Sequence, residues 1–325
     1  MKRYEMIRKA LYACVILILL LIICYSGLQI LESTVLHSGQ QEDNTGVSKT
    51  VYWNGIPYYP RQDITVILVL GIDENGPVKD SGSYNNTGEA DMISLIICDE
   101  KHEQIQLLHL NRDTMLEIPV LGINGRQAGT VTGQLALAHT YGSGLEDSCE
   151  NTRTAVSNFL KGIQIDHYVA MNMDAIPILN DAVGGVRVTV TDDFSAIDPS
   201  ISMGAHVLVG DQATVFLRSR RNLGDQLNVS RMERQREYLH AFLLALKEQN
   251  TDSFVASVYE QISPYIVTDC SVNLISSMLR RYGEYTIAGI HIPAGENVLG
   301  QTYYEFYPDA QQLEELILQL FYAPK

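Results

Sequence analysis

The longest apolar run of the chain lies close to its amino end. Residues 10–31 carry no formal charge, and the run is about as long as the ~20 residues that cross a bilayer as a helix. Mostly Lys and Arg precede it, and the positive-inside rule places that end in the cytoplasm. A cleaved signal peptide is the alternative, but no A-x-A-like cleavage pattern follows Ile30. We therefore predict cytoplasmic residues 1–9, a transmembrane signal-anchor helix over residues 10–31, and an extracellular remainder.

Beyond the apolar run, the pattern changes from a polar stretch to regular elements. Residues 32–62 are polar and predict an extracellular stalk, and residues 63–325 predict one domain. Continuous apolar runs typical of strands buried on both faces cover Ile64–Leu70, Met92–Cys98 and Ile105–Leu110. Helical spacing covers Thr152–Leu160, Met173–Ala182 and Met232–Gln249. Strands that alternate with helices predict an α/β fold: a three-layer sandwich whose central mixed, largely parallel sheet is flanked by helices.

The last of these predicted helices has two different sides. Its apolar stripe is expected to pack on the sheet and consists of Met232, Leu239, Phe242, Leu243 and Leu246. Ser230 and Glu233 have the spacing of a capping box, which predicts a helix that begins at Arg231. Arg231 and Gln235 are four residues apart, so they share one side of the helix, with Tyr238 one turn further on. Met232 and Leu239 are expected on the other side.

Composition and charge exclude several classes of protein. The 325 residues are 46% hydrophobic and 19% charged, enough apolar material for a folded core and too much for a disordered chain. The formal net charge of -15 excludes nucleic-acid binding through bulk charge. The cysteines form no C-x-x-C pair, so neither a disulfide framework nor a zinc site is indicated. Cys98, inside an apolar run, is expected to be a buried thiol.

Charged residues stand at the ends of the predicted strands, where ligands of open α/β sheets bind. Asp73 follows the first run, Asp91 precedes the second, and Arg112 follows the third. A loop rich in Gly, Ser and Asn, residues 74–88, is suited to folding over a ligand. Asp73 and Asp91 offer the carboxylate oxygens that Mg²⁺ prefers beside phosphate oxygens and water.

A cluster of arginines stands out in this acidic chain. It comprises Arg218, Arg220, Arg221, Arg231, Arg234 and Arg236. Arg218 and Arg220 share a face if that segment is extended. Arginines at a helix N-terminus oppose the helix dipole unless an anion binds there. Guanidinium groups together with free backbone N–H groups therefore predict a phosphate or pyrophosphate site.

These motifs, in this order, resemble the LytR-CpsA-Psr family of Gram-positive cell-envelope enzymes. The resemblance covers roughly residues 64–322 together with the membrane anchor. Its landmarks are Asp91 and the segments Leu68–Asp73, Leu110–Pro119, Gly162–Ile176, Asn180–Val190, Gly210–Arg220 and Ser230–Gln235.

The resemblance implies a phosphotransferase of cell-wall assembly. Members move a glycopolymer, such as teichoic acid or capsule, from an undecaprenyl-pyrophosphate carrier to peptidoglycan. It implies that Asp73 and Asp91 hold Mg²⁺. It also implies two roles for a set of polar side chains: they bind the pyrophosphate, and they stabilise the negative charge that develops during the transfer. The set consists of Arg112, Arg218, Arg220, Arg231 and Gln235. The implied catalytic residues are Asp91, Arg112, Arg218 and Arg220. Membrane lipid is an implied partner, whereas nucleic acid is not.

This chain departs from the family pattern at three places. Glu89 stands where the family commonly has Arg, and Asn228 where an Asp often precedes the helix arginine. The segment Gln134–His139 replaces a common Lys-Ile-Asn-Ala-Ala-Tyr element. Glu89 and the segment Gln134–His139 each take the place of a cation in the expected phosphate pocket. Glu89 could also add a metal ligand.

Three other functions stay open on the sequence. One is a lipid pyrophosphatase, which uses water as the acceptor. The second is a protein that binds carrier lipid or wall polymer without catalysis. The third, transcription regulation, is an old label of the family, and the outward topology and acidic charge argue against it.

Overall fold

The computed structural model describes residues 50–122, 125–219, 229–249 and 252–324. Within these ranges, no helix combines the length and apolar character needed to cross a membrane. The predicted anchor at residues 10–31 and the cytoplasmic residues 1–9 lie outside the described part of the chain.

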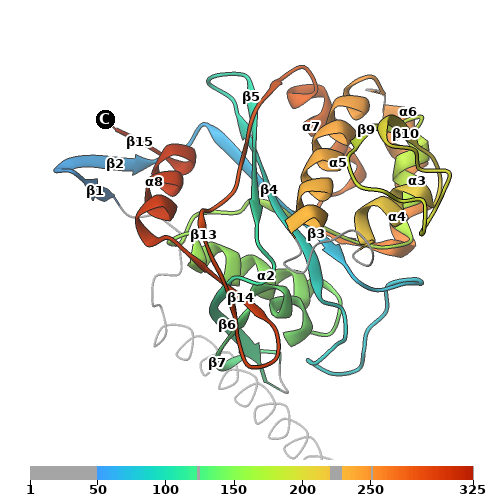
Figure 1. The fold of residues 1–325 in the computed structure, drawn as a ribbon. Helices are drawn as coiled ribbons and strands as arrows, with labels where there is room; N and C mark the ends of the chain where they lie inside the picture. The colour runs from blue at the N-terminus through green and yellow to red at the C-terminus, as the bar shows by residue number, and fades with distance from the viewer. Residues whose placement is uncertain (1–49, 123–124, 220–228, 250–251, 325) are drawn as a thin grey trace, which may run out of the picture. The chain divides into compact units, whose positions relative to one another are not determined.

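A six-stranded mixed sheet forms the centre of the domain (Figure 1). Its order is β11 (Ile266–Thr268), β8 (His167–Asn172), β3 (Ile64–Ile72), β4 (Ala90–Asp99), β5 (Gln104–Leu110) and β12 (Thr286–His291). The three predicted strands are confirmed as β3, β4 and β5. The expectation of a largely parallel sheet is wrong, because only β3–β8 and β5–β12 pair in parallel. A continuous apolar run indicates that a strand is buried on both faces of the sheet, but it does not indicate the strand's direction. Here helices cover both faces of strands that run antiparallel.

Helices cover both faces of the sheet, which confirms the α/β architecture of three layers (Figure 1). One face packs a core that joins Leu68 and Leu70 of β3 to Val156 and Ile317. The elements on this face are η1 (Leu135–Tyr141), α2 (Glu146–Phe159) and α8 (Ala310–Phe321). The opposite face is covered by α3 (Ala175–Ala182), α4 (Gln212–Arg218), α5 (Val229–Lys247), α6 (Asp252–Ile262) and α7 (Val272–Tyr282). A short 3-10 turn, η2 (Ser263–Tyr265), leads into β11.

The smaller sheets are all antiparallel and lie around this centre. They are β6 (Met115–Leu121) with β7 (Gln127–Gln134), β9 (Val186–Val190) with β10 (Gly204–Leu208), and β13 (Gly295–Leu299) with β14 (Tyr304–Pro308). A three-stranded sheet joins β1 (Val51–Trp53), β2 (Ile56–Pro60) and β15 (Tyr322–Pro324). The predicted stalk over residues 32–62 therefore needs correction, because residues 51–60 belong to the folded domain.

The predicted helices are present, but α5 differs from expectation at its start. It begins at Val229, so Ser230 lies inside the helix and is not its cap. The Ser230 hydroxyl instead lies 3.5 Å from a guanidinium nitrogen of Arg234. Asn228, one of the departures from the family pattern, lies outside the described residues.

Candidate active site

A β-bulge places Asp91 at the edge where β3 and β5 end. Gly71 pairs with Met92 whereas Ile72 pairs with Ala90, so Asp91 is the extra residue of β4. Because side chains alternate along a strand, Met92 faces the helices of the second layer and Asp91 would normally face away from them. The bulge breaks that alternation, and both side chains reach the same cavity.

The antiparallel order of β3, β4 and β5 explains why the charged strand ends meet. Ile72 of β3 and Leu110 of β5 pair with Ala90 and Ile93 of β4. The start of β4 therefore lies between the ends of its two neighbours. Asp73, Asp91 and Arg112 share one edge of the sheet for this reason, as the sequence predicted.

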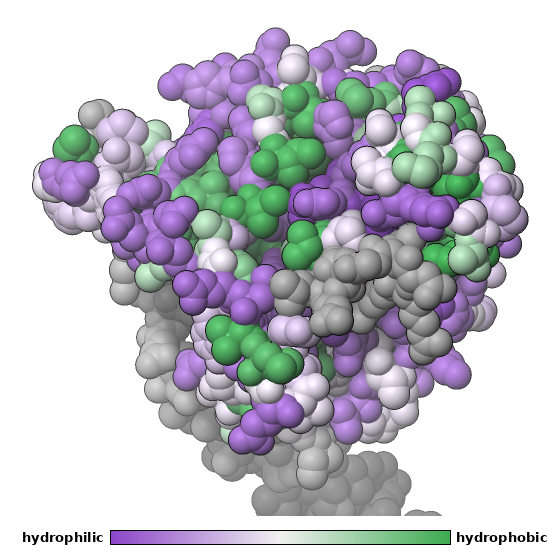
Figure 2. Space-filling model, in the orientation of Figure 1, coloured by the Kyte–Doolittle hydropathy of each residue, from purple (hydrophilic) through white to green (hydrophobic). Residues whose placement is uncertain are grey.

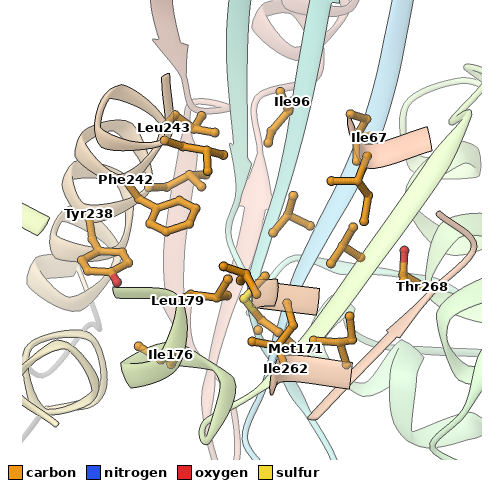
Figure 3. A pocket seen from close by; sticks show the side chains of 18 of the residues that line it. Ile67, Ile96, Met171, Ile176, Leu179, Tyr238, Phe242, Leu243, Ile262 and Thr268 are labelled. Carbon is orange, nitrogen blue, oxygen red and sulfur yellow. The ribbon is translucent and has the colours of Figure 1, made fainter. Parts of the chain in front are cut away.

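An apolar cavity of about 350 Å³ lies between this sheet and the helices of the second layer. Figure 3 shows Phe242 and Leu243 of α5 pointing toward side chains of the sheet, among them Ile67 and Ile96. Hydrophobic side chains also gather in the hollow where the sheet meets α5 and α7 (Figure 2). The other labelled residues of its wall are Met171, Ile176, Leu179, Tyr238, Ile262 and Thr268.

The cavity corrects the interpretation of the apolar stripe of α5. Leu239, Phe242, Leu243 and Leu246 line the cavity together with Arg231, Gln235 and Tyr238. Leu239 therefore shares the face of Arg231 and Gln235, and does not lie opposite it. The expectation that the stripe packs on the sheet holds for Leu239 and Leu243, which contact the cluster around Cys98, Ile105 and Leu107. The same face of the helix also lines the cavity.

Polar groups mark the two ends of α5 along the cavity wall. Arg231 and Gln235 line it near the start of the helix, and Lys247 lines it at the end. The helical rise places Arg231 and Lys247 roughly 24 Å apart. The cavity is thus an apolar passage with a cluster of charged groups, Asp91, Arg218 and Arg231, at one end.

Asp91 is held between two arginines. Its Oδ2 atom lies 2.5 Å from a terminal nitrogen of Arg231, and its Oδ1 atom forms an ion pair with Arg112. Both Asp91 and Arg231 are almost completely buried, with 5% and 2% of their side chains exposed. Each charge is compensated locally, as burial of charged groups requires.

Arg112 faces three carboxylates at once. Besides Asp91, Glu89 lies 2.5 Å from one terminal nitrogen, and Asp113 lies 3.3 Å from Nε. Gln134 donates a 2.9 Å hydrogen bond from Nε2 to Asp113 and another to the carbonyl oxygen of Tyr304. Two departures from the family pattern, Glu89 and Gln134, thus both belong to the surroundings of Arg112.

Arg218 pairs with Asp73 at the more open part of the site. The Arg218 nitrogen lies 2.9 Å from Oδ1 of Asp73, and 49% of the Arg218 side chain is exposed. Arg218 is the last residue of α4, so the extended conformation on which a face shared with Arg220 depended does not hold at Arg218. Arg220, predicted to share its face, lies outside the described residues.

Arg234 has a structural role in the arginine cluster. Its guanidinium group lies over the rings of Phe194 and Phe216 and pairs with Asp192. Its Nε donates a 2.8 Å hydrogen bond to the carbonyl oxygen of Phe216 in α4. Arg234 therefore fastens α5 to α4, which positions Arg231 and Arg218 relative to each other.

Asn86 holds the loop over residues 74–88, which the sequence suggested could fold over a ligand. Its amide donates to the carbonyl oxygens of His139 and Gly142 and to Ser148 Oγ, at 2.8–3.1 Å. Its Oδ1 accepts from the backbone N–H of Gly88, whose own carbonyl oxygen contacts His139 Nδ1 at 2.8 Å. The end of the loop that precedes Glu89 is therefore fixed. Sequence alone gave no signal for this role of Asn86.

The donor set at the strand ends is compatible with Mg²⁺. Asp73 and Asp91 supply hard oxygen atoms, and the side-chain oxygen of Gln235 is buried without a hydrogen-bond partner among the described residues. Both aspartates form ion pairs with guanidinium groups. A cation would therefore bind there once phosphate oxygens had replaced the aspartates as partners of those guanidinium groups.

A group of three metal-capable side chains, His167, Asp269 and Cys270, lies elsewhere in the described part of the chain. Asp269 already accepts from the backbone N–H of Tyr168 and lies 3.9 Å from Arg153. Burial raises the pKa of the Cys270 thiol to about 11. A metal at this group would have to compete with Arg153 for Asp269 and to displace the proton of the Cys270 thiol.

Buried thiols are a general feature of the described residues. Cys98, Cys149 and Cys270 are all free and buried. The expectation for Cys98 is confirmed, and burial raises its pKa to about 12.

The fold and the site define an α/β domain that combines an apolar passage with an arginine–carboxylate cluster at one end, which suits an amphipathic anion. The LytR_cpsA_psr family model matches residues 29–321, and the chain belongs to this family. The resemblance stated from the motifs is thereby confirmed.

Named relatives and a solved structure agree with this assignment. The chain is 28% identical over 213 residues to the polyisoprenyl-teichoic acid–peptidoglycan teichoic acid transferase TagU of Halalkalibacterium halodurans, covering 65% of this chain and 63% of that protein. It is 27% identical over 263 residues to TagV of Bacillus subtilis, a transferase of the same description, covering 77% and 62%. The chain thus spans less than two thirds of the length of both relatives. The crystal structure of B. subtilis TagV has the same fold, with a TM-score of 0.62 and 23% identity over 80% of this chain and 96% of that one.

Proposed function

We propose that this chain is a membrane-anchored phosphotransferase of cell-wall assembly. It moves a glycopolymer from an undecaprenyl-pyrophosphate carrier to peptidoglycan. The observation that carries this proposal is the apolar passage that ends at Asp91, Arg218, Arg231 and Gln235. A polyprenyl tail matches the passage, and a pyrophosphate matches its charged end.

The two parts of the site suggest which phosphate binds where. Arg218, Arg231 and Gln235 line the cavity, so they are placed to bind the phosphate attached to the lipid tail. Arg112 lies beyond Asp91, outside the cavity wall, and is placed to bind the phosphate attached to the glycan. Arginine suits both tasks because its planar fork of donors matches phosphate oxygens.

The transfer step follows from this placement. A hydroxyl of the acceptor sugar attacks the glycan-linked phosphorus, a new O–P bond forms, and the bond to the bridging oxygen breaks so that polyprenyl phosphate leaves. Arg112, Arg218 and Arg231 are fixed by ion pairs before the substrate arrives. Preorganised guanidinium groups stabilise the negative charge that develops on the phosphoryl oxygens.

Mg²⁺ belongs to the proposal as a cofactor. Asp73 and Asp91 would hold it, and when bound it would neutralise charge on the phosphates. Removal of divalent cations with a chelator should therefore abolish turnover, and added Mg²⁺ should restore it.

The location and the polymer are also part of the proposal. The uncharged run at residues 10–31 supports a single-pass protein with a cytoplasmic N-terminus and an extracellular domain. The relatives carry names of teichoic acid transferases, which favours a teichoic acid over a capsular polymer as the cargo.

The deciding experiment supplies all reactants to the full-length protein in detergent. A polyprenyl-pyrophosphate-linked oligosaccharide, peptidoglycan fragments and Mg²⁺ are incubated with it, and the products are identified by mass spectrometry. Glycan on peptidoglycan with release of polyprenyl phosphate, lost in Asp91→Ala, supports the transferase. Free sugar phosphate with polyprenyl phosphate would favour a pyrophosphatase, and binding without products would favour a carrier-binding protein.

A further inference from the structure

The three carboxylates around Arg112 differ greatly in exposure. The side chain of Asp91 is 5% exposed and that of Asp113 is 12% exposed, whereas that of Glu89 is 40% exposed. Asp91 is also held by Arg231, and Asp113 by Gln134. Glu89 therefore forms the contact of Arg112 that opens most easily to solvent.

The backbone of Glu89 is fixed although its side chain faces solvent. Its carbonyl oxygen accepts a 3.0 Å hydrogen bond from the backbone N–H of Asp73. The preceding residue, Gly88, is held by Asn86 and His139. Rotation about side-chain bonds alone can thus move the carboxylate away from Arg112, with no change in the loop.

We propose that Glu89 is the exchangeable ligand of Arg112. In the free protein its carboxylate occupies the guanidinium nitrogen to which an oxygen of the glycan-linked phosphate binds, and the substrate must displace it. The inference rests on the proposed function, since that function places the glycan-linked phosphate at Arg112. It adds an affinity-setting role for a residue that stands at a position where the family commonly has a cation.

Exchange gives Glu89 a role at both ends of the reaction. A pyrophosphate competes well with a carboxylate because it carries more charge and also binds the arginines of the cavity. After transfer, the glycan-linked phosphate is a diester with one negative charge and has no bond to the lipid. Glu89 then returns to Arg112, keeps this guanidinium paired, and favours release of the diester.

The exchange affects only ligands that carry the second phosphate. A monophosphate on a prenyl chain binds at Arg218 and Arg231, which Glu89 does not contact in the described structure. A diphosphate on the same chain also reaches Arg112. Removal of the Glu89 charge should therefore strengthen binding of the diphosphate and leave binding of the monophosphate unchanged.

Calorimetry with the full-length protein in detergent tests this difference. The probes are geranyl diphosphate and geranyl monophosphate, and the proteins are wild type, Glu89→Gln and Glu74→Gln. For Glu89→Gln we expect a Kd for the diphosphate about tenfold lower, the ratio that corresponds to ~1.4 kcal/mol, and a monophosphate Kd within about twofold of wild type.

Glu74→Gln is the matched control because it removes the same charge from the start of the same loop. Its carboxylate accepts a hydrogen bond from Thr87, and among the described residues it does not contact Arg112. Equal tightening in Glu74→Gln would mean a general field effect and would overturn the exchange. A change of both ligands alike in Glu89→Gln, or of neither, would also overturn it. If wild type binds neither probe, the proposed function fails, and this inference fails with it.

Discussion

The buried residue His109 predicts how much the free energy of unfolding changes with pH. This histidine of β5 is 2% exposed, and its Nδ1 atom lies 2.7 Å from Ser94 Oγ on the neighbouring strand. Burial, aided by the charges of Arg236 and Arg231, lowers its pKa from 6.5 to about 3. The ring is therefore neutral in the folded protein throughout the physiological range.

The sign follows from which state binds the proton. Between pH 6.5 and pH 3 the unfolded chain protonates this histidine and the folded chain does not, so stability falls as the pH falls through that window. Each unit of pKa difference is worth ~1.4 kcal/mol once the pH lies below both values. Between pH 8 and pH 5 the contribution of His109 to the loss of stability is about 2 kcal/mol.

Denaturant unfolding of wild type and His109→Gln isolates this contribution. Glutamine stays neutral at every pH and can still hydrogen bond to Ser94. Unfolding is followed by circular dichroism at pH 8, 7, 6 and 5. The loss of unfolding free energy between pH 8 and pH 5 should be about 2 kcal/mol smaller in the variant. If the two proteins lose the same amount, His109 is not held neutral by burial and the reasoning is refuted.

Three further predictions concern the site. Arg218→Ala and Arg231→Ala should both reduce transferase turnover by more than ~100-fold, whereas Arg280→Ala should leave it unchanged. Of these three arginine variants, Arg231→Ala alone should lower the free energy of unfolding, by about 3–5 kcal/mol, because it removes one partner of a buried pair. Leu243→Gln should weaken binding of geranyl diphosphate in calorimetry but not that of inorganic pyrophosphate, unless the prenyl tail lies outside the cavity. Asn86→Ala should lower the free energy of unfolding by about 1–3 kcal/mol in denaturant titrations, since it removes a set of partly buried hydrogen bonds. An unchanged midpoint would show that the loop is not held there.

The strand pattern and the site residues could be predicted from the sequence to a useful extent. Strand-length apolar runs predicted β3, β4 and β5, and the polar residues that follow or begin them predicted the edge where Asp73, Asp91 and Arg112 meet. Strand direction could not be predicted, because burial on both faces gives the same pattern in parallel and antiparallel strands.

The apolar stripe of α5 shows a second limit of sequence analysis. Periodicity predicts that Leu239, Phe242 and Leu243 avoid water, but a packed core and the wall of an apolar passage require the same residues. The bulge at Asp91 gives no signal in the sequence either, because it depends on the register between two strands. The ion pair of Glu89 with Arg112 likewise appears only when segments 23 residues apart are brought together.

The pairing of early strands with late strands of the domain affects how the chain folds during synthesis. β2 pairs with β15, and β12 closes one side of the central sheet against β5. Both partners follow residue 285, so the domain cannot complete either sheet before synthesis has passed these late strands. Until then, β2 and β5 are open edges to which another chain could pair. A protein shortened at its carboxyl end should therefore aggregate, even though such a truncation leaves every arginine of the site in place.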